Sequence, residues 1–93
     1  MGIEKDKQKI LIGLKKAESL LKKITSMVNG DGYCVDIMQQ NLAVIGLLRS
    51  VHSQVMKDHL SSCFIEGMNS KDPKKQHRLV EEIIKVNRLV SKA

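Results

Sequence analysis

The 93-residue chain has very few aromatic side chains and few residues that interrupt helices. It contains no Trp, one Tyr (Tyr33), one Phe (Phe64) and one Pro (Pro73). This scarcity argues against a β-sandwich, an aromatic RNA-binding platform or an aromatic-lined pocket for a small organic substrate, because each of these uses several rings. No apolar run approaches the roughly 20 residues of a membrane span, and charged residues come too early for a signal peptide. We therefore expect a cytoplasmic protein without membrane contact.

The charge of the chain is positive and unevenly distributed. The formal net charge is +6. Residues 1–25 and residues 70–93 each carry seven basic against three acidic residues, whereas residues 26–69 carry two basic against four acidic residues. Clustered cations attract a polyanion such as DNA, although solvated helix faces produce the same pattern. The length fits one domain, residues 1–93. A chain this small buries a modest fraction of its surface, so oligomerisation is a natural way to complete its hydrophobic core.

The first helix is predicted from apolar residues at steps of three and four, which mark one face of an amphipathic helix. These residues are Leu14, Ala17, Leu21, Ile24 and Val28. The cluster Asn29-Gly30-Asp31-Gly32 follows, and Asn and Gly tolerate the left-handed conformation at a helix end. We expect the first helix to end there.

Two further helices complete an all-α chain. From Cys34 to about Met68 there is no Pro and, before Gly67, only one Gly, which predicts one long helix. After a polar break, Asp72 can cap a third helix that has Pro73 at its first position, where the missing N–H costs little. The expected protomer therefore has three helices.

Cys34, His59 and Cys63 form the candidate metal site. His59 and Cys63 are four residues apart, so their side chains share one face of a helix, as a chelate requires. Cys34 precedes His59 by 25 residues, which in a continuous helix separates them by roughly 38 Å. These two residues cannot meet within one chain. They meet if two long helices pair antiparallel, with the two-fold axis near Leu47 and Leu48.

The middle of the long helix suggests such a pairing, because small residues permit close helix approach. Ala43, Gly46 and Ser50 follow steps of three and four there. Two identical sites between subunits would then follow from the symmetry of the dimer.

The three donors leave several chemistries open. Two thiolates and one imidazole are a soft set that suits Cu(I) better than Mg, Ca or Mn, whereas Zn(II) normally needs a fourth ligand. The cysteines could also be inert core residues, and a disulfide between Cys34 and Cys63 of another copy is disfavoured in the cytosol. Nothing resembles a nucleophile with a base, a phosphate-cradling loop or a pair of catalytic carboxylates, so we do not expect an enzyme.

The stretch from Gly32 to Cys63, GYCVDIMQQNLAVIGLLRSVHSQVMKDHLSSC, resembles the core of the CsoR family of small all-helical transcriptional repressors. That family's pattern is Tyr-Cys-x-Asp followed, about 25 residues on, by His-x3-Cys. The resemblance implies an antiparallel helical-bundle dimer that assembles into a dimer of dimers. It also implies a repressor that binds operator DNA without metal and releases it on binding Cu(I), so that copper-export genes are expressed.

The resemblance assigns roles to particular residues. It implies that Cys34, His59 and Cys63 bind Cu(I) and that Tyr33 lies beside the site. It also implies that Glu82, or its neighbour Glu81, accepts a hydrogen bond from the second imidazole nitrogen of the bound His, which could relay metal binding to the last helix. Nickel- and cobalt-sensing relatives have an additional N-terminal His, and formaldehyde- and persulfide-sensing relatives lack one of the ligands, which favours Cu(I).

The DNA-binding part of the family pattern is less complete. The family usually opens with Arg-Leu-x-Arg-x-Glu-Gly-Gln-Val, whereas this chain has Gly13 at the first position and Leu20 at the position of the Gln. We expect the remaining basic residues to neutralise DNA phosphates; these are Lys9, Lys15, Lys16, Lys22, Lys23 and Arg49. Two alternatives remain: a thiol- or persulfide-responsive repressor of the same fold, and a helical metal-buffering protein that binds no DNA.

Overall fold

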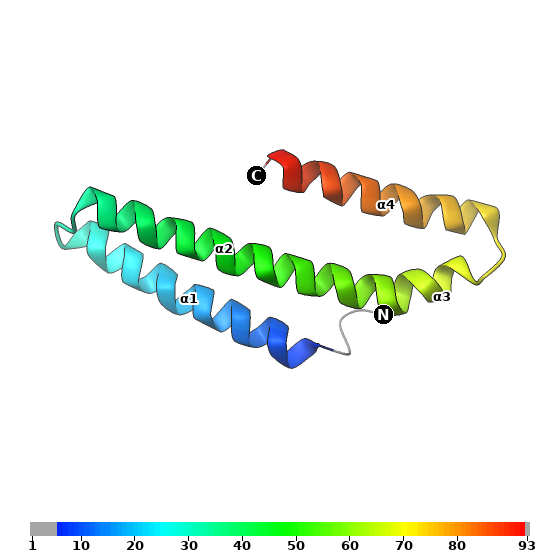
Figure 1. The fold of residues 1–93 in the computed structure, drawn as a ribbon, viewed down its shortest axis with the longest axis horizontal. Helices are drawn as coiled ribbons and strands as arrows, with labels where there is room; N and C mark the ends of the chain where they lie inside the picture. Colours follow the sequence, from blue (N-terminus) through cyan, green and yellow to red (C-terminus); the bar gives the residue numbers. More distant parts are fainter. Residues whose placement is uncertain (1–5, 93) are drawn as a thin grey trace. The chain divides into compact units, whose positions relative to one another are not determined.

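The computed structural model describes residues 6–92, and every regular element among them is a helix. Figure 1 shows the elements along the chain. They are α1 (Lys7–Asn29), α2 (Cys34–His59), a π-helical turn η1 (Leu60–Phe64), α3 (Ile65–Met68) and α4 (Pro73–Lys92). Because α2, η1 and α3 follow without a break, the described chain has three helical stretches. The all-α prediction is confirmed, and no described helix is long and apolar enough to cross a lipid bilayer.

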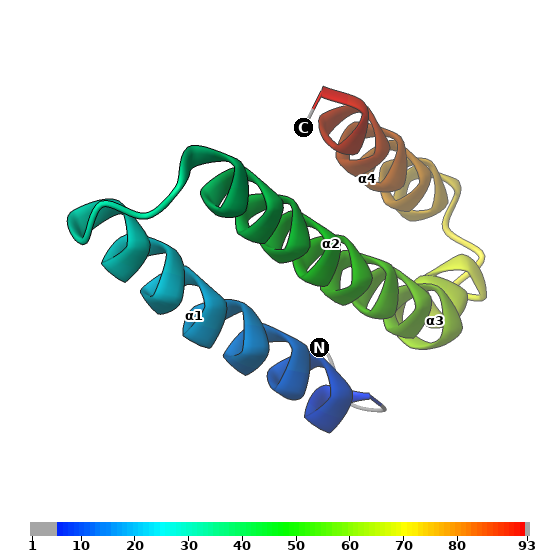
Figure 2. The same cartoon turned by 60° about the vertical axis from the view of Figure 1, so that its left-hand side comes forward.

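The described chain divides into two compact units, residues 6–58 and residues 59–92. In the first unit, α1 and α2 run antiparallel and side by side in both Figures 1 and 2. Ile10 and Ala17 of α1 and Val44 of α2 are its buried apolar residues. Gln54 of α2 donates a hydrogen bond to the carboxylate of Asp6 at 2.6 Å, which ties the start of α1 to α2.

The face of α1 that packs differs from the predicted stripe. Ala17 and Ile24 do belong to the less exposed face, but Leu14, Leu21 and Val28 remain 37%, 47% and 62% exposed. The less exposed face follows steps of three and four through Ile10, Gly13, Ala17, Leu20, Ile24 and Met27. A second apolar strip, with Leu14, Leu21 and Val28 at intervals of seven, is therefore left open beside the first.

The turn after α1 ends the helix where the sequence predicts, but with a different residue in the left-handed conformation. Asp31 has a φ of 61°, whereas Gly30 has a φ of −109°. The N–H of Gly32 bonds to the carbonyl of Met27 at 2.7 Å, which is the six-to-one hydrogen bond of a Schellman motif. A Cβ at Gly32 would lie 2.8 Å from that carbonyl oxygen, so this position requires glycine.

In the second unit, a short polar link joins α3 to α4. The N–H of Lys74 bonds to the side chain of Asp72 at 3.1 Å, which confirms Asp72 as the cap and Pro73 as the first helical residue. Gln76 donates a hydrogen bond to the carbonyl of Met68 at 2.7 Å. The single-domain prediction for residues 1–93 stays a prediction.

Candidate metal centre

Cys34 and His59 stand at the two ends of α2. At 1.5 Å per residue, the 25 residues between them correspond to roughly 38 Å, so they cannot bind one ion within one chain. Among residues 6–92, no three His, Cys, Asp or Glu side chains gather closely enough to hold a metal ion. A site that contains both Cys34 and His59 therefore requires a second copy of the chain.

Cys34 and His59 share one face of α2. Alternating steps of four and three connect them through the positions 34, 38, 41, 45, 48, 52, 55 and 59. Along this face, which we call the Cys34–His59 stripe, Met38, Ile45 and Leu48 are 57%, 41% and 44% exposed. The stripe also contains the polar Asn41 and His52, and it is half-buried from His52 to His59. Its exposed apolar part is the kind of surface that a second helix covers.

The small residues of α2 occupy a different face. Ala43, Gly46 and Ser50 are exposed but fall outside the Cys34–His59 stripe. A Cβ at Gly46 would meet nothing within 4 Å in this chain. These residues therefore do not support a helix crossing that brings Cys34 to His59. Support for that pairing comes from the exposed apolar side chains of the stripe.

His59 and Cys63 lie where the helix changes from α to π geometry, a feature that sequence reasoning missed. His59 ends α2 and Cys63 lies inside η1, so the His-x3-Cys segment spans the change. Single π turns are rare in helices and are frequent at functional sites. The imidazole of His59 contacts the ring of Phe64, with centroids 6.3 Å apart. Nothing in the local sequence distinguishes this turn from the α-helix before it.

The donor atoms fit a soft metal ion. The side chain of Cys34 is exposed and that of Cys63 is half-buried. The hydroxyl of Ser62 lies 3.9 Å from the Cys63 sulfur, within hydrogen-bonding range for sulfur. With the half-buried imidazole of His59 the two cysteines would make a set of two sulfurs and one nitrogen, which are donors that soft metal ions prefer.

The residues expected beside the metal are on the surface in this chain. Tyr33, next to Cys34, is 68% exposed. Glu82 is exposed, and the carboxylate of Glu81 lies 3.8 Å from Nε2 of His77, one turn earlier on α4. The predicted roles of Tyr33, Glu81 and Glu82 stay predictions.

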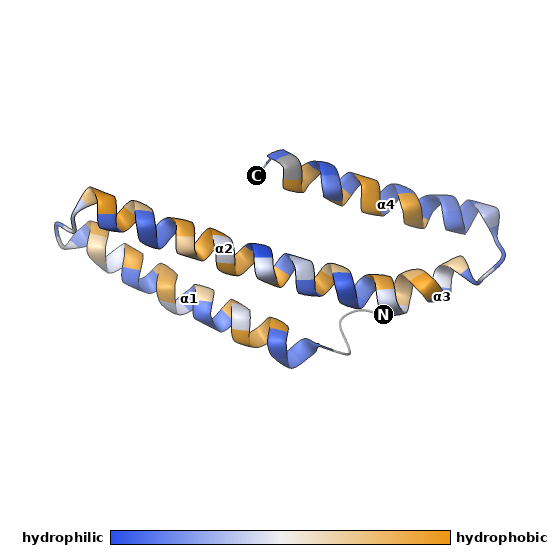
Figure 3. Cartoon of the chain, viewed as in Figure 1, coloured by the Kyte–Doolittle hydropathy of each residue, from blue (hydrophilic) through white to orange (hydrophobic). Residues whose placement is uncertain are grey.

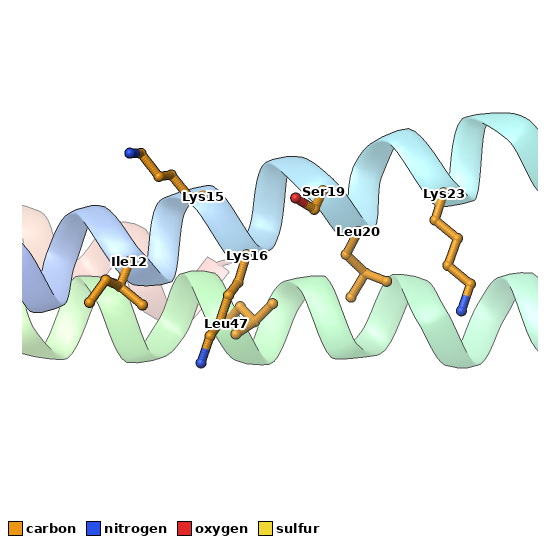
Figure 4. Close-up of a pocket in the computed structure, with 7 residues that line it drawn as sticks. All are labelled: Ile12, Lys15, Lys16, Ser19, Leu20, Lys23 and Leu47. Carbon is orange, nitrogen blue, oxygen red and sulfur yellow. The ribbon is translucent and has the colours of Figure 1, made fainter.

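The basic residues expected to contact DNA are all exposed, and three of them border a groove on the first unit. Figure 4 shows the groove, with Ile12 and Leu20 projecting from α1 towards α2. Its volume is about 590 Å³, and its lining residues are Ile12, Lys15, Lys16, Ser19, Leu20, Lys23 and Leu47. The groove thus has an apolar floor, a basic rim and no carboxylate among its lining residues.

Comparison with known proteins identifies the family. A family model described as "Metal-sensitive transcriptional repressor" matches residues 6–89. The chain belongs to this family. The copper-sensing transcriptional repressor RicR of Mycobacterium tuberculosis is 30% identical over 96% of this chain and 93% of its own length. The copper-sensing transcriptional repressor CsoR of Bacillus subtilis is 35% identical over 73% of this chain and 67% of its own length. No solved structure matches the chain significantly.

This metal-sensitive repressor departs from its family's opening pattern at positions that the structure explains. Leu20 replaces the expected Gln and contributes to the apolar floor of the groove. Gly13 replaces the expected Arg and lies on the face of α1 that packs, where a Cβ would be 2.8 Å from Cγ2 of Val51. Both departures therefore belong to the contact between α1 and α2.

Proposed function

We propose that this protein is a copper-responsive transcriptional repressor, which binds operator DNA without metal and releases it when Cu(I) binds, so that copper-export genes are expressed. Membership of the metal-sensitive repressors supports repression, and relatives named as copper-sensing support copper as the signal. The protein would act in the cytoplasm, where DNA and reduced thiols are both present.

The metal site would form between two copies of the chain. The observation that carries this proposal is that Cys34 and His59 lie at opposite ends of one face of α2, on which Met38, Ile45 and Leu48 are exposed. When two α2 helices pack antiparallel along this stripe, Cys34 of each copy meets His59 and Cys63 of the other, and the apolar residues cover each other. A homodimer then holds two Cu(I) ions, and two dimers assemble into a tetramer.

Repression would respond to copper because copper binding and DNA binding are thermodynamically linked. Copper lowers the affinity for DNA only if it binds more tightly to the conformation that does not bind DNA, and DNA must then weaken copper binding by the same factor. The exposed lysines of α1 and Arg49 of α2 would neutralise phosphates, so the affinity for DNA should fall steeply with salt.

A gel-shift experiment tests the function as a whole. The reduced protein is mixed with a duplex from upstream of its own gene, and Cu(I) is then added in stoichiometric steps. We expect a shifted band without copper that disappears at about one Cu(I) per chain, while a scrambled duplex binds weakly throughout. Copper binding without any preference for the upstream duplex would support the metal-buffering alternative.

A further inference from the structure

Helix α4 gathers its cations into one row. Lys74, Arg78, Lys85, Arg88 and Lys92 follow steps of four, seven, three and four, which keeps them on one side of a helix. All five are exposed. Over the 18 residues from first to last, the row is about 27 Å long. We call it the α4 basic row; it contains five of the seven basic residues between 70 and 93.

The opposite side of α4 is the side that packs. Gln76, Leu79, Ile83 and Val86, at steps of three and four, are the half-buried residues of this helix. Leu79 packs directly at Gly67 of α3, where it leaves no room for a Cβ. Figure 3 shows hydrophilic and hydrophobic positions alternating along α4, as in an amphipathic helix. The basic row therefore faces away from its own unit.

Acidic residues interrupt the row at one place only among the described residues of α4. Glu81 and Glu82 fall between Arg78 and Lys85, and the carboxylate of Glu81 already lies 3.8 Å from the imidazole of His77. Without a partner, five exposed cations along one helix face gain little from each other and repel. A partner with closely spaced negative charges removes that repulsion.

We propose that the α4 basic row binds the phosphate backbone of the operator duplex, as a second DNA surface besides the lysines of α1. This inference rests on the proposed function and deepens it. Double-stranded DNA carries one negative charge per roughly 1.7 Å of its axis, so it offers phosphates along the whole row. Contacts to phosphate alone add affinity and register but read no bases.

An anionic membrane is the other polyanion that a basic amphipathic helix can bind, and the packing of α4 disfavours it. A helix that binds a membrane inserts its apolar face between lipids. In α4, Leu79, Ile83 and Val86 are half-buried in the fold. The exposed apolar residues of this helix do not share one side of it; they are Val80, Ile84, Leu89 and Val90. The row itself contains only charged residues, which suits a phosphate backbone.

The test compares the salt dependence of DNA binding for two variants of equal charge. The first carries Lys85→Gln and Arg88→Gln within the row. The second carries Lys57→Gln and Lys75→Gln, both exposed and both outside the row. Binding of each full-length variant to the upstream duplex is measured by fluorescence anisotropy from 50 to about 250 mM salt, and circular dichroism and sedimentation confirm that fold and assembly are unchanged.

We expect the row variant to have a shallower slope of log K against log salt concentration. Each lost phosphate contact reduces the slope by about 0.9, so the two substitutions reduce it by about 1.8 for each subunit whose row contacts DNA. The off-row variant should keep the slope of the wild type. Equal slopes for both variants, with a wild type that binds the duplex, would overturn this inference and leave the proposed function intact. A wild type that binds no duplex would overturn both.

Vesicles of phosphatidylcholine with phosphatidylserine test the alternative that the row binds an anionic membrane. We expect negligible binding of the wild type at physiological salt. Binding to these vesicles that the row variant loses, with its DNA slope unchanged, would assign the row to membranes and overturn the proposal.

Discussion

Gly13 of α1 lies so close to Val51 of α2 that a Cβ at position 13 would be 2.8 Å from Val51 Cγ2. Real Cβ atoms essentially never come so near. Val51 is β-branched and lies within α2, where one χ1 rotamer is strongly preferred, so its γ-methyl does not rotate away easily. The absence of the family's usual arginine at this position thus reflects how tightly the two helices pack here. In this repressor the position belongs to the contact between the two helices.

Replacing Gly13 by Ala should destabilise the fold, although Ala is normally the better helix former. Helix propensity favours Ala by about 1 kcal/mol, but overpacking a contact costs roughly 1–3 kcal/mol. We expect a net loss of about 1 kcal/mol in urea unfolding. Combining Gly13→Ala with Val51→Ala should recover part of that loss, because the shorter side chain makes room for the Cβ. A Gly13→Ala protein more stable than the wild type would contradict this packing.

Replacing Ile45 by Glu should separate the subunits. Ile45 is 41% exposed in the middle of the Cys34–His59 stripe, and a carboxylate there would be buried in the apolar interface of the proposed dimer. Ser50→Glu places the same charge on the face with the small residues and serves as the matched control. Sedimentation velocity should show mostly monomer for Ile45→Glu and unchanged assembly for Ser50→Glu. The reverse pattern would mean that the small residues form the interface.

Removing the imidazole of His59 distinguishes a copper site from a switch made of two thiols. A three-coordinate Cu(I) site that loses its nitrogen donor should bind copper at least tenfold more weakly in competition with a chromogenic chelator. Oxidation of Cys34 and Cys63 needs no imidazole, so a dithiol switch would still release DNA when treated with persulfide or peroxide. Copper affinity unchanged in His59→Ala would favour the thiol-responsive alternative.

The sequence is sufficient to predict the helices, because their limits depend on local chemistry. Asp72 and Pro73 define the start of α4 through one hydrogen bond and one fixed backbone angle. The packing face of α1 could not be predicted in the same way. Two apolar strips lie side by side on that helix, and the one that packs includes Gly13, which an apolar pattern does not reveal.

For the candidate site, too, some features could be predicted from the local sequence and others could not. Cys34, His59 and Cys63 could be selected from residue type and spacing, and the structure places the first two on one stripe of α2. The π turn around Cys63 has no sequence signal, because Leu, Ser and Cys form ordinary α-helix elsewhere in the chain. Ala43, Gly46 and Ser50 lie on a face of α2 other than that of Cys34 and His59, and small size alone does not reveal which helix face a partner covers.

In the proposed dimer each copper site takes Cys34 from one chain and His59 and Cys63 from the other, and a complementation experiment tests this arrangement. Cys34→Ser and the double variant His59→Ala/Cys63→Ser each lack a complete site when alone. Unfolded together and refolded as a mixture, they form mixed dimers in which one site regains all three donors. We predict that neither variant alone binds Cu(I) tightly, whereas the mixture recovers tight binding at about one ion per mixed dimer. A mixture that forms mixed dimers and binds copper no better than its separate components would contradict the account.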